Sequence, residues 1–315
     1  MPRIMVWAYG GSDFFFHYAY YAKIELFEDY AVEIIEQIQK TIHQDSPVDY
    51  GRGLAGIGVG IEYLAQNKFL DINTNEILED FDSKIACEIA YKHHNNSGLC
   101  DGLTGLGKYL YFRLVNQQIL CNEINLIANR QSIMRIVAKI EETITSADHY
   151  LPDILLLLYK LYPLGICNSK IDYCINKFQA TFSTSFILSV NRPEMAFALM
   201  LVAVSYKYME EVAYICTKDV LQKIIQTRAL YKGDTGSNPY EIVLWLIRCK
   251  RFIKQTNINT VLIPQVETLI YEYIETFTDM PFEQGKLSLK GCAGMGLIFI
   301  SMLTESDDTW LELYG

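Results

Sequence analysis

Several features are scarce in this chain, and each scarcity excludes a class of protein. Charged residues make up only 20% of its 315 residues, and the 27 Lys and Arg are outnumbered by 37 Asp and Glu. The resulting net charge of -10 argues against binding to nucleic acid or to an anionic membrane surface, because both need a basic patch. Proline and glycine are few, at 8 and 19 residues, strand-like alternation is rare, and no linker stands out. These observations predict a single all-α domain.

Long apolar runs and paired cysteines are also missing. No apolar run reaches the ~18 residues of a membrane-spanning helix, and the amino-terminal stretch lacks the cleavage site of a signal peptide. The eight cysteines are scattered, without a Cys-x-x-Cys pair, so we expect reduced thiols in a cytoplasmic protein. Half of the residues are hydrophobic and 13% are aromatic, which is enough to bury a large core.

One glycine signature occurs three times. It reads Gly-Leu-Ala-Gly-Ile-Gly at 53–58, Cys-Asp-Gly-Leu-Thr-Gly-Leu-Gly at 100–107 and Gly-Cys-Ala-Gly-Met-Gly at 291–296. The first and second copies are 49 residues apart and the second and third are 189 apart, which is four further steps of roughly 47 residues. No strand precedes the first copy, as a dinucleotide-binding loop would require. We therefore interpret each copy as the start of a helix in a repeated helix hairpin.

Hydrophobic periodicity completes this pattern. Six hairpins fit the chain, three with the glycine signature and three without it, and residues 1–18 form a strand-like arm or an extra cap. The first helices of the hairpins are expected at 21–44, 81–93, 124–144, 171–188, 212–229 and 258–277. The second helices follow the breaks and run to about Leu64, Leu114, Leu161, Tyr208, Phe252 and Leu303.

The second helix of each hairpin is apolar nearly all round, which predicts that it is buried. Alternating exposed and buried helices describe either an open α-solenoid or an α/α toroid, in which the buried helices form an inner ring. In a toroid the glycine motifs would gather at one end of that ring. Glycine at a helix start lets the chain turn sharply and lets neighbouring backbones approach closely.

The three glycine motifs resemble the repeats of the lanthionine synthetase C-like family, the cyclases of lanthipeptide biosynthesis and their relatives. The resemblance follows the repeat period over nearly the whole chain, and it implies an α/α toroid, with seven inner helices in the familiar cyclases. It also implies a ribosomally synthesised peptide as substrate and, as a partner, a protein of the same modification pathway. In the cyclases a zinc ion, held by a Cys from Trp-Cys-Tyr-Gly and the Cys and His of Cys-His-Gly, activates a substrate thiolate.

This chain departs from the family pattern at the zinc ligands. It has Leu-Tyr-Lys at 230–232 and Leu-Lys at 289–290 where the ligand motifs would stand, and Cys100-Asp101-Gly102 is its nearest match to Cys-His-Gly. A lysine ammonium beside a dication is unfavourable. We therefore expect no metal, no other cofactor and no zinc-dependent cyclisation, so that the chain binds or modifies a peptide by other means.

Three residues are candidates for catalysis. Cys100 and Asp101 stand at a helix start, where a thiolate is stabilised, although Asp101 can equally cap the helix while Cys100 packs. A split metal site of Cys100, Asp101 and Cys292 is a further alternative. His149, near the third inner-helix start, can act as a general base or lie in a polar turn.

A second group of candidates would bind a ligand or peptide at the same end of the helices. Cations near helix starts suit an anionic ligand or are solvated rim residues. Carboxylates at similar positions suit a six-hairpin glycosidase or lyase or simply cap helices, and a non-catalytic helical adaptor is the remaining alternative. The candidates for binding are Arg52, Arg192, Lys232, Asp234, Lys290 and Cys292.

Overall fold

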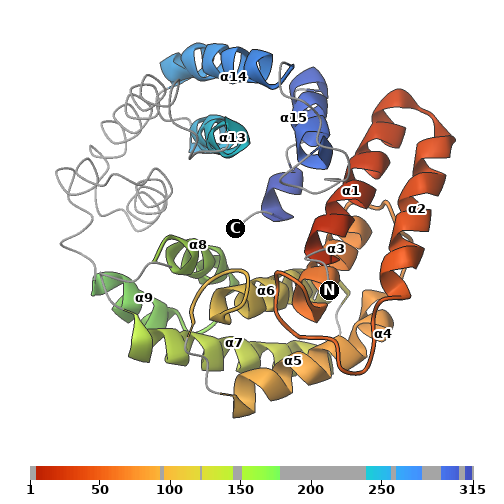
Figure 1. Ribbon diagram of the computed structural model, residues 1–315. Coiled ribbons are helices and arrows are strands. Elements are labelled where there is room, and N and C mark those ends of the chain that lie inside the picture. The colour runs from red at the N-terminus through yellow and green to blue at the C-terminus, as the bar shows by residue number, and fades with distance from the viewer. Residues whose placement is uncertain are drawn as a thin grey trace. The chain divides into compact units, whose positions relative to one another are not determined.

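The computed structural model describes residues 5–92, 96–120, 123–144, 151–177, 239–256, 260–278, 292–304 and 309–313. All regular secondary structure in these ranges is helical, as the sequence predicted. The chain divides into two compact units, Met1–Cys174 with Gly285–Gly315 (unit 1) and Ile175–Gln284 (unit 2) (Figure 1). Within the described part of the chain, no helix is both long and apolar enough to cross a membrane.

Unit 1 is built on a row of buried helices. In the row each helix contacts the next, in the order α15, α1, α3, α6 and α8 (Figure 1). Their bounds are Cys292–Thr304, Met5–Ala22, Leu54–Gln66, Leu103–Leu120 and Leu151–Leu161. Every residue of α3 from Leu54 to Leu64 is buried, which confirms the prediction that this apolar helix lies inside.

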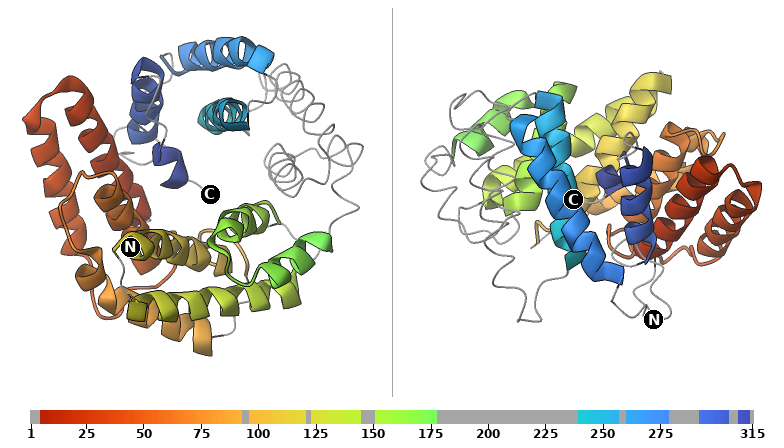
Figure 2. Two further views of the ribbon diagram at one scale, coloured as in Figure 1. Left: turned by 180° about the vertical axis from the view of Figure 1, so that it is seen from behind. Right: turned by 90° about the horizontal axis from the view of Figure 1, so that it is seen from above.

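A second layer of helices covers this row. Helix α2 packs on α1, α5 on α3 and α7 on α6, and Figure 2 shows the two layers from behind and from above. The outer helices of unit 1 are α2 (Glu25–Gln39), α5 (Glu79–Tyr91) and α7 (Glu123–Thr143), and its short elements are α4 (Thr74–Ile77), η1 (Tyr162–Leu164) and η4 (Thr309–Leu313). Helix α9 (Asn168–Asn176) begins in unit 1 and ends in unit 2. Only Ala31, Ile35 and Ile38 of α2 are buried, as expected of an amphipathic outer helix.

Helix α1 corrects one expectation. Residues 5–22 form neither a strand-like arm nor a loose cap but a helix that contacts α2, α3 and α15. The helical period is hidden there because aromatic and small residues that are buried, such as Phe16, Ala19 and His17, occur on several faces of α1. A helix that is buried on more than one side carries no clear stripe of apolar residues.

The first glycine of the signature is required by a loop that folds back over the helix start. The N–H of Leu54 donates to the carbonyl of Pro47 at 2.9 Å, and the N–H of Leu103 donates to the carbonyl of Asn96 at 3.2 Å. In both cases the hydrogen bond joins residues that are seven positions apart. A Cβ on Gly53 would lie 2.1 Å from the Pro47 oxygen, and one on Gly102 would lie 2.5 Å from the Asn96 oxygen. Close backbone approach therefore explains these glycines. We call residues 47–53 and 96–102 the hinge loops.

The third glycine of each copy lets the next helix of the row approach. A Cβ at Gly58, Gly107 or Gly296 would lie 2.4, 2.5 or 2.2 Å from a neighbouring side chain. Those side chains are Tyr109 of α6, Leu157 of α8 and Phe14 of α1, respectively. All three copies thus make the same helix-to-helix contact, and α1 stands beside α15 as α6 stands beside α3.

A buried ion network joins the layers of unit 1. The guanidinium of Arg113, on α6, contacts the carboxylates of Glu62 on α3 and Asp82 on α5, with an Nη2–Oδ2 distance of 2.7 Å to Asp82. Arg113 and Glu62 are fully buried, and Asn116 donates to Glu62 at 2.6 Å while Tyr109 donates to Asp82 at 2.6 Å. Because every carboxylate has hydrogen-bond donors, the network is structural, and it fixes α6 against α3 and α5.

Unit 2 contains a helix hairpin. Helix α13 (Pro239–Thr256) packs on α14 (Ile263–Thr278), which follows the short helix η3 (Thr260–Leu262). An ion pair of 2.7 Å joins Lys250 and Glu267. This hairpin confirms the helices expected around 240–252 and 258–277. The prediction of a single domain concerns both units together and stays a prediction.

Candidate functional site

The two hinge loops lie against each other and form the centre of the candidate site. The N–H of Gly51 donates to the carbonyl of Cys100 at 2.7 Å, and the carboxylate of Asp153 accepts from the N–H of Leu99 at 3.3 Å. A Cβ on Gly105 would lie 2.5 Å from the Cβ of Tyr50. These contacts hold the starts of α3, α6 and α8 together.

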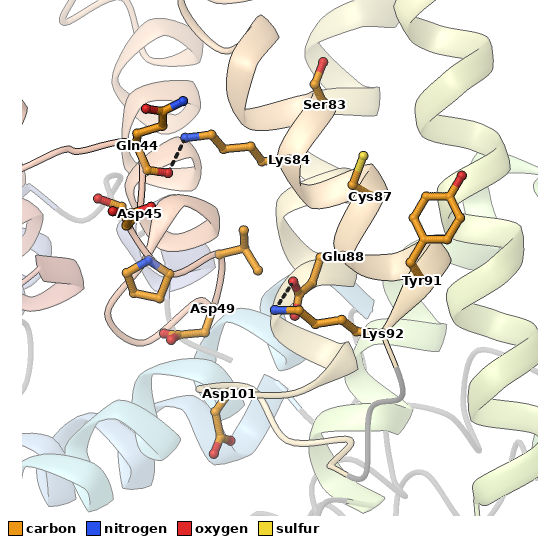
Figure 3. A pocket seen from close by; sticks show the side chains of 13 residues that line it. Gln44, Asp45, Asp49, Ser83, Lys84, Cys87, Glu88, Tyr91, Lys92 and Asp101 are labelled. Carbon is orange, nitrogen blue, oxygen red and sulfur yellow. Dashed lines mark hydrogen bonds and ion pairs between the residues drawn. The ribbon is translucent and has the colours of Figure 1, made fainter.

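An open pocket of about 780 Å³ lies where the first hinge loop faces α5. Figure 3 shows Asp49 of that loop and Asp101 of the second hinge loop on the same side of α5. The pocket is lined by Gln44, Asp45, Ser46, Pro47, Val48, Asp49, Ser83, Lys84, Cys87, Glu88, Tyr91, Lys92 and Asp101.

The charge of this pocket is acidic. Four of its lining residues are carboxylates and two are lysines. Lys92 pairs with Glu88 at 2.7 Å, and the Nζ of Lys84 donates to the backbone carbonyl of Gln44 at 3.1 Å. The balance favours a cationic or hydroxyl-rich ligand over an anionic one.

A second cluster, which is buried, lies at the starts of α3 and α6. The hydroxyl of Tyr50 donates to the carbonyl of Leu313 at 2.6 Å, and the ammonium of Lys108 donates to the same oxygen at 3.0 Å. The Lys108 Nζ also lies 5.1 Å from the centroid of the Tyr50 ring. Both donors are nearly inaccessible, at 5% and 4% exposure. Two buried side chains thus donate hydrogen bonds to one main-chain carbonyl.

Asp13 of α1 is a further buried polar group of unit 1, and its charge acts on Tyr50. It is fully buried, and among the described residues neither of its oxygens has a hydrogen-bond partner. Burial raises the pKa of Asp13 well above its usual value, so the protonated acid is favoured. Burial also raises the pKa of Tyr50, with smaller contributions from Cys100 and from Asp13. The cluster therefore offers hydrogen-bond donors, and its chemistry suits a carbonyl or carboxylate oxygen.

The structure describes four of the site residues that the sequence indicated. Arg52 is exposed and pairs with Asp49 at 3.8 Å, Asp101 accepts a 2.6 Å bond from the side chain of Asn96, and Cys100 is an exposed cysteine. Cys292 is half-buried at the first turn of α15. The other five, His149, Arg192, Lys232, Asp234 and Lys290, lie outside the described residues.

The described residues allow one comparison with the zinc site of the resembled cyclases. Within the described ranges, no three His, Cys, Asp or Glu side chains are grouped closely enough to hold a metal ion, and this includes Cys100, Asp101 and Cys292. One Asp101 oxygen is already bonded to Asn96. This donor set does not fit the three-ligand zinc site of the resembled cyclases. Positions 230–232 and 289–290, where the family ligands would stand, lie outside the described residues.

The buried cluster is not evident from the sequence. Asp13 stands in an aromatic and glycine-rich stretch without helical period, and Tyr50 precedes the first glycine motif. Lys108 carried a usable signal, because it is a cation at the second turn of an apolar helix, next to Gly107. A buried charge in such a position is expected to have a specific partner.

Comparison with known proteins adds no family. The chain matches none of the protein-family models against which it was scanned, and a search of the curated proteins finds no relative.

Proposed function

We propose that this chain is a lanthionine synthetase C-like protein that binds or modifies a ribosomally synthesised peptide without zinc-dependent thioether cyclisation. The observation that carries the proposal is the repeated glycine contact. Gly58, Gly107 and Gly296 each admit a side chain of the next buried helix, so one packing rule is used three times in unit 1. Such a rule supports closure of the whole chain into an α/α toroid of about six hairpins.

The hinge loops are the place where this function would reside. In a repeated hairpin fold the starts of the inner helices gather at one end, and their free N–H groups give that end a positive potential. In unit 1 that end carries the carbonyl-binding pair Tyr50 and Lys108 and the exposed thiol of Cys100. Donors for main-chain carbonyls beside a thiol suit a peptide ligand.

Two measurements on the purified full chain test the proposal. Fluorescence polarisation should show saturable binding of labelled peptides rich in Ser, Thr and Cys, and no binding of matched peptides rich in Lys and Glu. Metal analysis by mass spectrometry should find far less than one zinc per chain. Stoichiometric zinc that is lost in Cys100→Ala or Cys292→Ala would contradict the absence of zinc chemistry, and failure of every peptide to bind would contradict the peptide function.

The acidic pocket favours a second candidate, a hydrolase or lyase of glycosidic bonds. Asp49 and Asp101 come from different loops and line one pocket, and glycosidases act through two carboxylates that flank the scissile bond. A panel of polysaccharides assayed with wild type, Asp49→Asn and Asp101→Asn decides this candidate. Hydrolysis that is abolished by either substitution supports it, whereas absence of hydrolysis or survival in both variants excludes these residues.

A further inference from the structure

Helix η4 is held in unit 1 in the manner of a bound peptide. Trp310 is fully buried, and Leu311 and Leu313 are 3% and 5% exposed. The Trp310 indole N–H donates to the hydroxyl of Ser301 on α15 at 2.6 Å, and the hydroxyls of Thr309 and Tyr63 lie 3.0 Å apart. The segment is therefore anchored by one large aromatic side chain and by polar contacts from α3 and α15.

The carboxyl-terminal end of η4 is bound through its main chain. The Leu313 carbonyl receives the hydroxyl of Tyr50 and the ammonium of Lys108. When side-chain donors bind the main-chain carbonyl of a peptide, they tolerate almost any side chain at that residue of the peptide. Peptide-binding grooves use main-chain hydrogen bonds in this way. An ordinary core contact needs no buried ammonium, because an apolar side chain would fill the same volume at a lower cost.

The carboxyl of Asp13 strengthens this interpretation. It is fully buried and has no hydrogen-bond partner among the described residues. Buried polar groups without a partner are uncommon in folded proteins, and a bound ligand can supply the missing hydrogen bond. We use the name η4 groove for the surface formed by Tyr50, Tyr63, Lys108 and Ser301, whose side chains contact residues 309–313.

We infer that the η4 groove is a peptide-binding site and that residues 309–313 are its resident ligand. The ligand class is a short peptide with a tryptophan or similar aromatic anchor and a main-chain carbonyl three residues later. The inference rests on the proposed peptide-binding function, because it names where on unit 1 the peptide would lie. In the intact chain, η4 competes with an added peptide and lowers its apparent affinity.

The test separates η4 from its groove after folding. A protease recognition sequence is inserted between Thr304 and Thr309, the uncut protein is shown by circular dichroism to be as helical as wild type, and the chain is then cut. We expect the cut protein to remain helical and to release the segment on dilution. A fluorescein-labelled peptide of residues 309–315, Thr-Trp-Leu-Glu-Leu-Tyr-Gly, should then bind in its place.

Matched variants show whether the named contacts are responsible. Tyr50→Phe and Lys108→Met in the cut protein should each weaken binding of the labelled peptide by about tenfold, since each removes one hydrogen bond to the carbonyl. Lys170→Met, which removes an exposed cation on α9, should leave binding unchanged. A peptide with Ala in place of Trp310 should lose binding by more than a hundredfold.

Several outcomes would overturn the inference. They are unfolding of the cut protein when the segment leaves, failure of the peptide to bind again, and equal binding by wild type, Tyr50→Phe and Lys108→Met. If Ser-, Thr- and Cys-rich peptides bind equally well before and after cutting, the peptide function stands and the groove is elsewhere. If the peptide of residues 309–315 binds again but no foreign peptide does, the groove stands and the proposed function fails.

Discussion

The glycines of the second motif allow a quantitative test of the packing rule, because two of them have different neighbours in one helix. A Cβ on Gly105 would lie 2.1 Å from the backbone oxygen of Leu99 and 2.5 Å from the Cβ of Tyr50. A Cβ on Gly107 would lie 2.5 Å from Cδ2 of Leu157, which is the end of a flexible side chain. Gly105→Ala must therefore move backbone, whereas Gly107→Ala requires only a side-chain rotation.

Both substitutions gain stability from replacing a helical glycine by alanine, but they differ in the stability lost through overpacking. Alanine in place of glycine inside a helix stabilises by about 1 kcal/mol. Overpacking typically costs about 1–3 kcal/mol, and we assign the upper end to Gly105 because the carbonyl of Leu99 would have to retreat by more than 1 Å to reach van der Waals distance. We expect Gly105→Ala to lower the free energy of unfolding by about 2 kcal/mol, and Gly107→Ala to change it by less than about 1 kcal/mol.

Urea unfolding followed by far-ultraviolet circular dichroism measures both variants against wild type. The expected result is a lower midpoint for Gly105→Ala with an unchanged slope, and a midpoint near that of wild type for Gly107→Ala. A Gly105→Ala protein as stable as wild type would refute the reasoning, because the hinge loop would then not lie against the helix start. Equal destabilisation by both variants would show that the flexibility of the Leu157 side chain does not decide how much stability overpacking removes.

Three further predictions concern the buried groups of both units. Arg113→Met should destabilise by about 3–5 kcal/mol because it strands the buried Glu62 carboxylate, and adding Glu62→Leu should restore part of the loss in urea unfolding. Asp13 has a raised pKa in the folded state, so wild-type stability should fall as pH rises from about 4 through that folded pKa. Asp13→Asn cannot ionise and should gain stability relative to wild type over the same range, and a difference that is independent of pH would contradict the assignment. Burial raises the pKa of Cys249 to about 12, so iodoacetamide should label the exposed Cys100 in the native protein, as detected by mass spectrometry, and should label Cys249 only after unfolding.

Much of the local structure could be predicted because its causes are local. Helix α8 spans Leu151–Leu161, as expected, and α7 and α15 begin and end within a residue or two of the expected limits. Apolar residues at steps of three and four indicate such helices without any knowledge of their partners. Helix α1 was the exception, since a helix packed against α2, α3 and α15 has no single apolar face for the pattern to show.

The candidate site was predicted only in part, for a related reason. Asp101 and Arg52 stand beside recognisable glycine motifs, so their position at the helix starts followed from the sequence. Nothing near Asp13 in the sequence points to Tyr50, and although Lys108 is a cation within an apolar helix, the sequence does not show which group it contacts. The acidic pocket was likewise hidden, because α5 and both hinge loops contribute to it.

The sequence by itself determined that the described chain is helical outside α1, that the helices following the glycine motifs are buried, and where those helices begin. These properties depend on contacts within a few residues, such as the bond from Leu54 to Pro47. Only the tertiary structure decided that the Leu313 carbonyl meets Tyr50 and Lys108, which are 263 and 205 positions away in the chain. Contacts at such separations arise from how the helices pack, and no periodicity in the sequence encodes them.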